Sequence, residues 1–491
     1  MPATKTSNRP AVRAGRNRHV LLCNGATAPR RAGRPGAATT VWELRTFGPA
    51  ANVRLRVDDI TRALGRHLPD EVLDLLELAA LVYAADQCCG RTPGRRFEYG
   101  LTFHRDLRFR VAVRRPEFWS RPDVLDALVD TLHFLSYDDY AFDFSQLADP
   151  PPVQAYLFGD AGAGLGPVDQ VMMMSGGLDS LAGAVGQVLH EGRRVALVSH
   201  RPAPHVTARQ RQLVAGVNRR ARHRRLPPVH VPVTCHKLGL EEHDATQRTR
   251  SFLYATLGAA VAHLFGLSEV WFYENGVTSV NLPLCGQEVG GRATRTTHPR
   301  AMHGFGRLLS LAFGRPFAAR NGFFWHTKQE VLEVLRPGRH TPLAADSVSC
   351  SHTRWTTSPS PHCGLCSQCL ARRVAAIGAA YGPHDPADGY RVDPLTADRT
   401  RDEERALAER FLGQARSVAR MTAVREFDRQ YAGELARVYP YLDMPTPTAA
   451  ERLFDLHLRH ARQVSDAVVG EARAHLADGW HGRLGATSAL T

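Results

Sequence analysis

The chain has 491 residues, of which 43% are hydrophobic, and it carries a formal net charge of +14. This length predicts about three domains, and the hydrophobic content is sufficient for packed cores. No apolar run approaches the roughly 20 residues of a membrane span, and no hydrophobic signal-peptide core is evident near the N-terminus. The positive charge permits anionic ligands or partners but identifies none, because an arginine-rich coding bias gives the same composition.

Residues 1–40 are basic, with several arginines and a lysine but no acidic residue. Glycine, alanine and proline fill much of the remainder, which predicts a disordered basic tail. An organellar transit peptide has a similar composition, but no amphipathic helix is evident here, so that interpretation is not favoured.

Residues 41–150 are predicted to form a small N-terminal α+β domain of unknown role. Strands are expected at 53–57 and 101–113, where apolar residues alternate, and helices are expected at 73–85 and 124–135.

Three aspartates follow the second of these helices, namely Asp138, Asp139 and Asp143. They could bind a metal, but their spacing matches no calcium loop, so turn and capping roles are favoured. A proline- and glycine-rich stretch over residues 150–167 is typical of a linker.

From residue 168 the pattern alternates strand with helix, which predicts the α/β class with a doubly wound parallel sheet. Strands are expected at 171–174, 195–199, 230–233 and 269–273, and helices at 206–225 and 250–264. In open sheets of this kind ligands bind beyond the carboxyl ends of the strands. We therefore expect the segments 175–180, 199–200 and 274–276 to line one pocket.

The helix at 206–225 is rich in arginine, which raises the question of nucleic-acid binding. It lacks the interleaved aromatic residues on which bases stack, so a solvated outer face is the favoured interpretation.

The segment after the first strand carries the most specific signal in the chain. It reads Ser175-Gly176-Gly177-Leu178-Asp179-Ser180. Glycines allow the backbone to approach an anion, and the start of the following helix supplies unpaired N–H groups and a positive dipole end. The Asp179 carboxylate would repel phosphate unless it holds a backbone turn or a magnesium ion. An ordinary strand-to-helix turn would explain the glycines alone, and the spacing and lysine of a Walker A loop are absent.

Four of the nine cysteines lie close together, at Cys350, Cys363, Cys366 and Cys369. Two successive C-x-x-C steps place three thiolates in one knuckle, and Cys350 can supply the fourth corner of a tetrahedron. Zinc in a structural role is expected, with an iron–sulfur cluster as the alternative. The clustering favours a metal site over disulfides, and hence a reducing, cytoplasmic location.

The other cysteines lack such neighbours and are expected to be packing residues; they are Cys23, Cys88, Cys89, Cys235 and Cys285. The last part of the chain, residues 398–480, is predicted to be helical, with helices at 401–420, 424–438 and 450–476. We expect this region to pack on the α/β domain that precedes it or to hold a partner, with its histidines at the surface.

The 175–180 loop resembles the pyrophosphate loop of the adenine-nucleotide alpha-hydrolase (PP-loop) superfamily, whose members cleave ATP between its α and β phosphates. With the C-G-L-C-S-Q-C-L-A-R string at the cysteines, the chain is similar to the QueC (7-cyano-7-deazaguanine synthase) family over residues 168–380. This resemblance implies a Rossmann-like ATP-binding catalytic domain that uses ATP, Mg²⁺ and Zn²⁺. It also implies a 7-deazaguanine carboxylate as the substrate.

The chain departs from QueC in two respects. QueC is a compact single-domain enzyme, whereas this chain adds segments on both sides. In place of the QueC G-x-N-x-x-D and G-Y-P-D-C strings it has E-N-G at 274–276, N-L-P-L at 281–284 and T-R-T-T-H-P at 294–299. These strings resemble the QueC-like proteins of bacterial antiphage systems of the Qat and type IV CBASS kinds. That resemblance implies antiviral defence and a protein partner from the same operon.

The resemblance also implies the site residues. ATP would be bound by Ser175, Gly176, Gly177, Leu178, Asp179, Ser180, Ser199, His200 and Arg250. The substrate would be bound by Glu274, Asn275, Arg295, Thr296, Thr297 and His298. Asp179, Lys328 and His298 would be catalytic. Taken alone, Arg250 and Lys328 are typical of surface charges, Glu274 of a cap or turn residue, and His298 of a structural histidine.

The implied reaction is that of an ATP-dependent ligase. AMP is transferred to the carboxylate, pyrophosphate leaves into the loop, and the acyl group passes to an amine of a protein or to ammonia. One alternative is nitrile formation for queuosine-type nucleosides. Another is a non-catalytic nucleotide-binding scaffold of a defence complex, which the intact loop disfavours. A tRNA-acting enzyme is least favoured, because the clustered cysteines would be held by metal, and neither nucleic acid nor a membrane is an expected partner.

Overall fold

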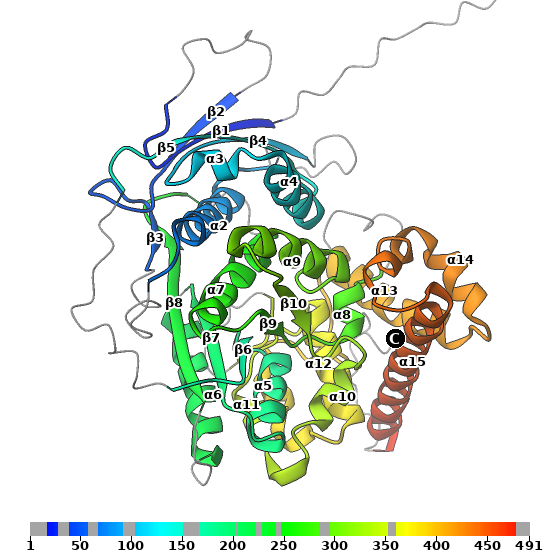
Figure 1. Ribbon diagram of the computed structural model, residues 1–491. Helices are drawn as coiled ribbons and strands as arrows, with labels where there is room; N and C mark the ends of the chain where they lie inside the picture. Colours follow the sequence, from blue (N-terminus) through cyan, green and yellow to red (C-terminus); the bar gives the residue numbers. More distant parts are fainter. Residues whose placement is uncertain are drawn as a thin grey trace, which may run out of the picture.

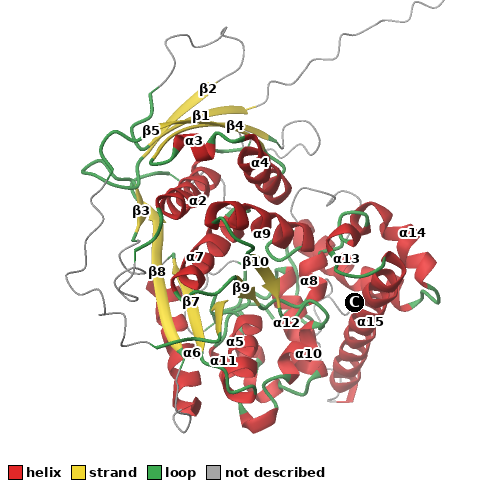
Figure 2. Ribbon diagram, in the orientation of Figure 1, coloured by secondary structure: helices red, strands yellow, loops and turns green. Residues whose placement is uncertain are grey.

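The computed structural model describes residues 17–27, 39–56, 67–91, 104–150, 166–202, 204–221, 228–241, 247–283, 295–351 and 360–477. Within these residues the chain is a mixed α/β protein with two β-sheets (Figure 1). Figure 2 shows one sheet at the top of the molecule and the other in its centre, with helices between and around them. Most of the predicted linker over residues 150–167, residues 1–16 of the predicted tail and residues 222–225 lie outside the described residues.

The upper sheet has four strands in the order β2-β1-β4-β5, and every neighbouring pair is parallel. The strands are β1 Asn17–Cys23, β2 Thr39–Leu44, β4 Arg105–Val113 and β5 Asp139–Gln146. Its helices are α2 Asp70–Cys88, α3 Pro116–Trp119 and α4 Pro122–Ser136. All three lie on one side of the sheet (Figure 1).

Two expectations for this part of the chain are wrong. The tail predicted to be disordered over residues 1–40 contains Asn17–Cys23, which forms the inner strand β1. Leu21 and Cys23 are fully buried there, but the surrounding arginines dominate the composition. The α+β class is also wrong for the sheet, because β4, α4 and β5 form a β-α-β unit with parallel strands.

The central sheet has six strands in the order β10-β9-β6-β7-β8-β3. They are β3 Val53–Leu55, β6 Gln170–Met173, β7 Val195–Arg201, β8 Val229–Lys237, β9 Glu269–Phe272 and β10 Ala318–Asn321. All neighbours are parallel except β3, which pairs antiparallel with β8. From β6 the chain adds β7 and β8 on one side and then β9 and β10 on the other, so the strand order reverses between β6 and β9. The strand predicted at 53–57 therefore belongs to the central sheet.

Helices cover both faces of the central sheet. In β6, Val171 and Met173 belong to one apolar cluster, and Met172 belongs to another on the opposite face. The first face is covered by α7 Arg250–Leu264, α9 Pro299–Phe313 and α2. The second face is covered by α5 Leu178–Val185, α6 Pro204–Ala221, α10 Lys328–Glu333 and α11 Leu343–Asp346. The continuous apolar sequence of β6 follows from this burial on both sides.

The C-terminal part is helical, as predicted. Its helices are α12 Ser367–Gly378, α13 Asp402–Ala419, α14 Val424–Leu435 and α15 Thr446–Ala477. They share an apolar core with residues of the central part, among them Val280 of the short helix α8 Gly276–Val280. His457 of α15 is buried and lies 2.7 Å from the Leu453 carbonyl oxygen, so its predicted surface position is wrong.

The remaining elements are single helical turns, namely Gly186–His190, Pro337–Arg339, Gly382–His384, Ala387–Gly389 and Tyr439–Tyr441. Among the residues that the structure describes, no helix combines the length and apolar character that crossing a membrane requires.

Candidate functional site

The 175–180 loop begins where β6 ends and leads directly into α5. Gly176 has a φ of +91°, in the left-handed region that only glycine adopts without steric cost. A Cβ at this position would also lie 3.3 Å from the Gln210 side chain. The turn of the loop therefore requires glycine.

Both serines of the loop use their hydroxyl groups to hold the turn. The Ser175 hydroxyl oxygen accepts a hydrogen bond from the Gly177 N–H at 3.2 Å. The Ser180 hydroxyl donates to the Gly177 carbonyl at 3.0 Å, and the two hydroxyl oxygens are 3.1 Å apart. Ser175 is exposed, whereas Ser180 is buried. The loop is thus shaped in advance of any ligand.

Asp179 joins the loop to two distant segments. Its Oδ1 accepts a hydrogen bond from Lys328 Nζ at 2.5 Å. Its Oδ2 accepts from the side-chain and backbone N–H groups of Asn275 at 2.9 and 3.2 Å. Asp179 and Lys328 are both buried, so each charge needs the other as its partner. The carboxylate therefore holds a lysine and an asparagine where the sequence suggested a backbone turn or a magnesium ion.

Helix caps fix both partners of Asp179. Lys328 is the first residue of α10. Thr327 and Glu330 form a reciprocal capping box around it, with distances of 3.3 and 3.0 Å. Asn275 caps α8, because its Oδ1 accepts from the Thr278 N–H at 3.0 Å. Asn275 was predicted to bind substrate, but its side-chain NH₂ group donates to Asp179 and its side-chain oxygen accepts the cap hydrogen bond.

Glu274 lies beside this group. The Thr297 hydroxyl donates to Glu274 Oε2 and lies 2.8 Å from the Ser279 hydroxyl. Burial raises the pKa of Glu274, and the nearby Asp179 charge adds to the rise, whereas the Thr297 hydrogen bond and the charges of Lys328 and Arg250 oppose it. Of the predicted substrate residues, Glu274 and Thr297 are therefore brought together next to the loop.

Arg250, the first residue of α7, is exposed on the same side. Its guanidinium lies 5.8 Å from the centroid of the Tyr254 ring. The Tyr254 ring, Tyr83 and Glu274 together raise the pKa of Arg250. In the described part of the chain no hydrogen bond or ion pair engages this guanidinium. It is thus a cation available to an anionic ligand.

Ser199 and His200, which were predicted to contact ATP, lie beneath the loop and not at its surface. The Ser199 hydroxyl donates to the Met174 carbonyl at 2.9 Å, and His200 Nε2 lies 2.7 Å from the Cys235 carbonyl oxygen. Both residues are buried, and burial lowers the pKa of His200 to about 4. Their side chains therefore bond to backbone carbonyls beneath the loop.

Arg295 and His298 also occupy structural positions. The Arg295 guanidinium donates to the Phe134 carbonyl at 2.7 Å and lies 3.9 Å from the centroid of the Tyr137 ring. His298 caps α9, where its Nδ1 accepts from the Arg300 N–H at 3.1 Å. Burial lowers the pKa of His298 to about 3, which favours the neutral ring near pH 7. Both side chains therefore have partners within the protein.

Thr296, the remaining predicted substrate residue, is half-buried between them. Two residues that the sequence did not indicate have clear roles. Gln210 Nε2 donates to the carbonyls of Ser175 and His200 at 3.2 and 2.9 Å. Asn321 exchanges hydrogen bonds with the Glu274 backbone at 3.0 and 2.8 Å. Asn321 ends β10, a strand too short and too polar to be predicted.

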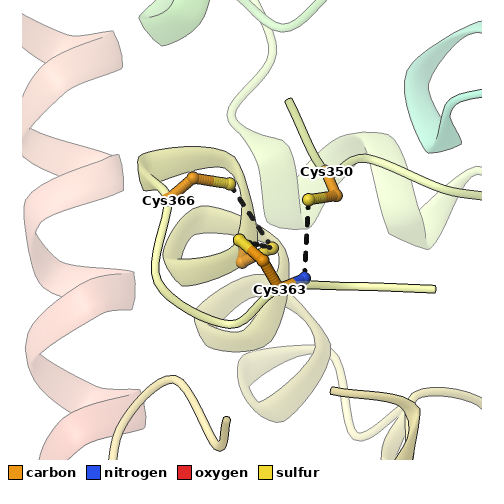
Figure 3. Close-up of side chains that lie close together, drawn as sticks. Cys350, Cys363 and Cys366 are labelled. Carbon is orange, nitrogen blue, oxygen red and sulfur yellow. Dashed lines mark hydrogen bonds between the residues drawn. The ribbon is translucent and has the colours of Figure 1, made fainter. Parts of the chain in front are cut away.

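The four clustered cysteines converge as predicted. Their sulfur atoms all lie within 4.8 Å of one another, with 3.4 Å between Cys366 and Cys369 and 3.8 Å between Cys363 and Cys369. The Cys363 N–H donates to Cys350 Sγ at 3.4 Å, and Figure 3 shows the thiols of Cys350, Cys363 and Cys366 gathered at the start of α12. Within the described residues this is the one group suited to hold a metal ion.

These distances match one tetrahedral ion. Zn–S bonds of about 2.3 Å place neighbouring sulfurs about 3.8 Å apart. In an iron–sulfur cluster the thiolates bind separate iron ions, so their sulfur atoms lie further apart than around a single ion. The short sulfur–sulfur distances here therefore favour zinc. Gly364 has a φ of +80°, and a Cβ there would lie 1.6 Å from the Val392 carbonyl oxygen. The knuckle therefore depends on glycine at this position.

The cysteine cluster supports the loop through the backbone. The Val348 N–H, two residues before Cys350, donates to the Gly176 carbonyl at 3.1 Å. Arg372 of α12 is buried and donates to the Ser347 and Ala344 carbonyls at 3.1 and 2.9 Å. A metal ion that fixes Cys350 and α12 would therefore also fix the segment that holds the loop.

No protein-family model matches this chain, and no curated protein matches it. Its function must therefore be inferred from its own residues and their geometry.

The buried histidines predict a pH-dependent stability. An unfolded histidine binds a proton below about pH 6.5, but folded His298 has a pKa of about 3 and stays neutral. The unfolded state thus binds more protons as the pH falls, so the free energy of unfolding should fall by about 2 kcal/mol for this residue between pH 7.5 and 5. His298→Asn keeps an acceptor for the helix cap but does not titrate. Urea unfolding at several pH values should show a weaker pH dependence in this variant, and an identical dependence would contradict the prediction.

Proposed function

We propose that this chain is an ATP-dependent ligase of the PP-loop type that adenylates a 7-deazaguanine carboxylate and transfers it to an amine on a protein partner. The observation that carries the proposal is the junction that Asp179, a residue of the 175–180 loop, forms with Lys328 and Asn275. This junction joins the loop that resembles the PP-loop to the E-N-G string at 274–276 and to the start of α10. The point of reversal between β6 and β9 is where doubly wound nucleotide-binding sheets place their ligands.

The loop region has the charges and donors that pyrophosphate release requires. Gly176 and Gly177 place no side chain between the loop backbone and a ligand, and the positive charges of Lys328 and Arg250 both act on Glu274. A carboxylate oxygen of the substrate attacks the α-phosphorus of ATP, and pyrophosphate leaves toward these donors as negative charge develops. ATP would bring Mg²⁺ on its phosphates, since both Asp179 oxygens are engaged by protein groups.

Glu274 is the residue best suited to recognise the deazaguanine. A carboxylate accepts two hydrogen bonds side by side, which matches the N–H and NH₂ groups of a guanine-like edge. Thr297 donates to one of its oxygens, which can accept a second hydrogen bond, and no described residue donates to the other. The acyl-adenylate is then attacked by the amine, and AMP leaves as an amide forms.

The remaining elements of the proposal follow from the chain's own features. Zinc at the four cysteines would be structural, because four thiolates leave no open position. Thiols kept reduced for metal binding support a cytoplasmic location. The E-N-G and T-R-T-T-H-P strings support a role in antiphage defence, and the added helices and upper sheet offer surface for a protein acceptor.

The test is to incubate the purified chain with ATP, Mg²⁺, a 7-deazaguanine carboxylate and the proteins encoded beside it. Pyrophosphate release should depend on the acid, and the intact mass of one partner should increase by the mass of the acid minus water. Free nitrile as the main product with no modified partner would restore ordinary QueC function. ATP binding without any turnover would instead favour the non-catalytic scaffold.

A further inference from the structure

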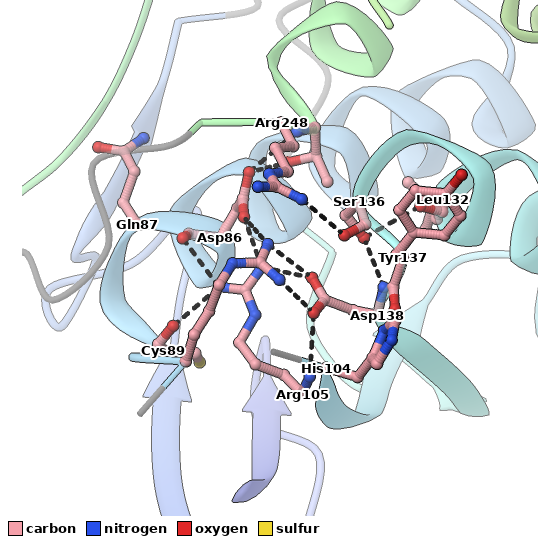
Figure 4. A network of polar contacts seen from close by, with 12 residues as sticks. Asp86, Gln87, Cys89, His104, Arg105, Leu132, Ser136, Tyr137, Asp138 and Arg248 are labelled. Atoms are coloured by element: carbon pink, nitrogen blue, oxygen red, sulfur yellow. Dashed lines mark hydrogen bonds and ion pairs between the residues drawn. The ribbon is translucent and has the colours of Figure 1, made fainter. Parts of the chain in front are cut away.

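The upper sheet reaches the candidate site through a buried network of charges. Asp86 at the end of α2 binds Arg105 of β4 at 2.6 Å, and Arg105 binds Asp138 at 2.5 Å. Arg91 binds the other oxygen of Asp138 at 2.7 Å. All four side chains are buried. Figure 4 shows Asp86, Arg105 and Asp138 together with Arg248, a further buried arginine that donates to the Ser136 carbonyl at 3.3 Å. Burial alone would raise the pKa of Asp138, but Arg105 and Arg91 hold it well below its ordinary value.

The second carboxylate oxygen of Asp86 contacts the start of α7 instead of the arginines. Asp86 Oδ2 accepts from the Thr249 N–H at 2.9 Å and from the Thr249 hydroxyl at 3.2 Å. Thr249 is fully buried and is the residue directly before Arg250. Its own side chain provides no cap for α7, so the Asp86 carboxylate takes that role from another element.

A second contact, one turn earlier in α2, joins this helix to the segment that precedes α7. The Tyr83 hydroxyl donates to Gln247 Oε1 at 3.3 Å, and the Tyr83 ring stands edge-on to His200 at 5.7 Å. His200 in turn lies 5.4 Å from Tyr254, the ring beside Arg250. Helix α2 therefore contacts both the residues before Arg250 and the residues beneath the loop.

We infer that Asp86 is a positioning residue for the nucleotide site, and that the upper sheet serves to aim Arg250 at the phosphates of ATP. The inference rests on the proposed function for the identity of the ligand. Both oxygens of Asp86 are used, one for Arg105 and the other for Thr249. An asparagine amide has only one acceptor oxygen. In Asp86→Asn the NH₂ group would therefore face either the Arg105 guanidinium or the Thr249 N–H, and two donors would face each other.

The chain supplies a matched control in the same helix. Asp74 of α2 is also buried, and both of its oxygens are used, with the Arg114 guanidinium at 2.9 Å and the Arg115 N–H at 3.0 Å. These partners follow β4 and do not belong to α7. Asp74→Asn therefore has the same chemical defect as Asp86→Asn but leaves the Arg250 segment untouched.

The experiment measures the affinity for ATP of the full chain by calorimetry, together with its thermal stability. Asp86→Asn and Arg250→Ala should each weaken ATP binding about tenfold, the scale of one charge-assisted hydrogen bond. The double variant should bind no more weakly than either single variant, because both changes remove the same contact. Asp74→Asn should lower the melting temperature but keep the wild-type affinity.

The outcomes separate this inference from the proposed function. Wild-type protein that does not bind ATP overturns both. An Arg250→Ala loss without an Asp86→Asn loss, or equal losses in Asp86→Asn and Asp74→Asn, overturns the inference alone. Thr249→Val provides a second variant if Asp86→Asn fails to fold, because it removes only the 3.2 Å hydroxyl bond. It should weaken ATP binding two- to threefold, by roughly half of a typical hydrogen bond, and unchanged affinity would count against the inference.

Discussion

Asp179→Asn is expected to lower pyrophosphate formation from ATP by about 10²- to 10³-fold, the effect of removing one preorganised electrostatic group from an active site. The asparagine amide cannot accept at once from Lys328 Nζ and from the Asn275 amide, which now bond separate oxygens of Asp179. The buried Lys328 ammonium then loses its counter-charge, which costs about 3–5 kcal/mol when one member of a buried pair is removed. Stopped assays of released pyrophosphate and urea unfolding measure the two losses separately.

A double variant distinguishes catalysis from stability. Combining Asp179→Asn with Lys328→Met removes both buried charges, and such neutral replacements of a buried pair often cost little stability. The double variant should therefore regain much of the free energy of unfolding but remain inactive. An Asp179→Asn protein that is folded and forms pyrophosphate at the wild-type rate would falsify the assignment of the loop.

The parts of the fold that the sequence predicted are those with local signals. The strand 171–174, the helix over residues 250–264 and the four-cysteine cluster were each predicted close to where they occur. Each has a strong pattern of its own, because β6 is apolar on both faces and the C-x-x-C spacing fixes the sulfurs. The proximity of Asp179 to Lys328 was implied by the resemblance alone, since residues 149 apart in sequence give no local signal.

The misses share a different cause. Strand β1 is flanked by arginines, so the composition of its surroundings hides it. The directions of the Arg295 and His298 side chains depend on Phe134 and Tyr137, which come from a different part of the fold. Asp138 was assigned a turn or capping role but is the centre of a buried ion network. For Arg295, His298 and Asp138, contacts between segments distant in sequence determine what each side chain does. The periodicity and spacing of the sequence do not predict such contacts.

The same reasoning links the metal site to the loop. Cys350 lies two residues after Val348, whose N–H holds the Gly176 carbonyl. Ser347 is bound by Arg372, which lies in α12 only three residues after Cys369. A bound metal would therefore connect α12 to the segment that holds the turn of the loop. Its loss should affect ATP use as well as stability.

The purified chain is expected to contain about one zinc ion, and Cys366→Ser should lose it and unfold at least locally. Metal binding supplies folding free energy in such sites, on the order of 10 kcal/mol for small zinc domains. In the absence of an ion, the neighbouring cysteines raise the pKa of Cys369, and burial adds to the rise. Four thiolates this close together therefore need a cation. Elemental analysis gives the metal content, and melting curves with and without a chelator give its contribution to stability.

Cys235→Ser is the matched control for the metal prediction, since Cys235 is a buried free cysteine far in sequence from the cluster. It should keep full zinc content, and chelation should still lower its melting temperature. Brown protein with visible charge-transfer absorbance would show an iron–sulfur cluster and overturn the zinc assignment. A third outcome is zinc-free protein that has an unchanged melting temperature but forms no pyrophosphate. That result would show that the metal holds Val348 against Gly176 and does not stabilise the fold.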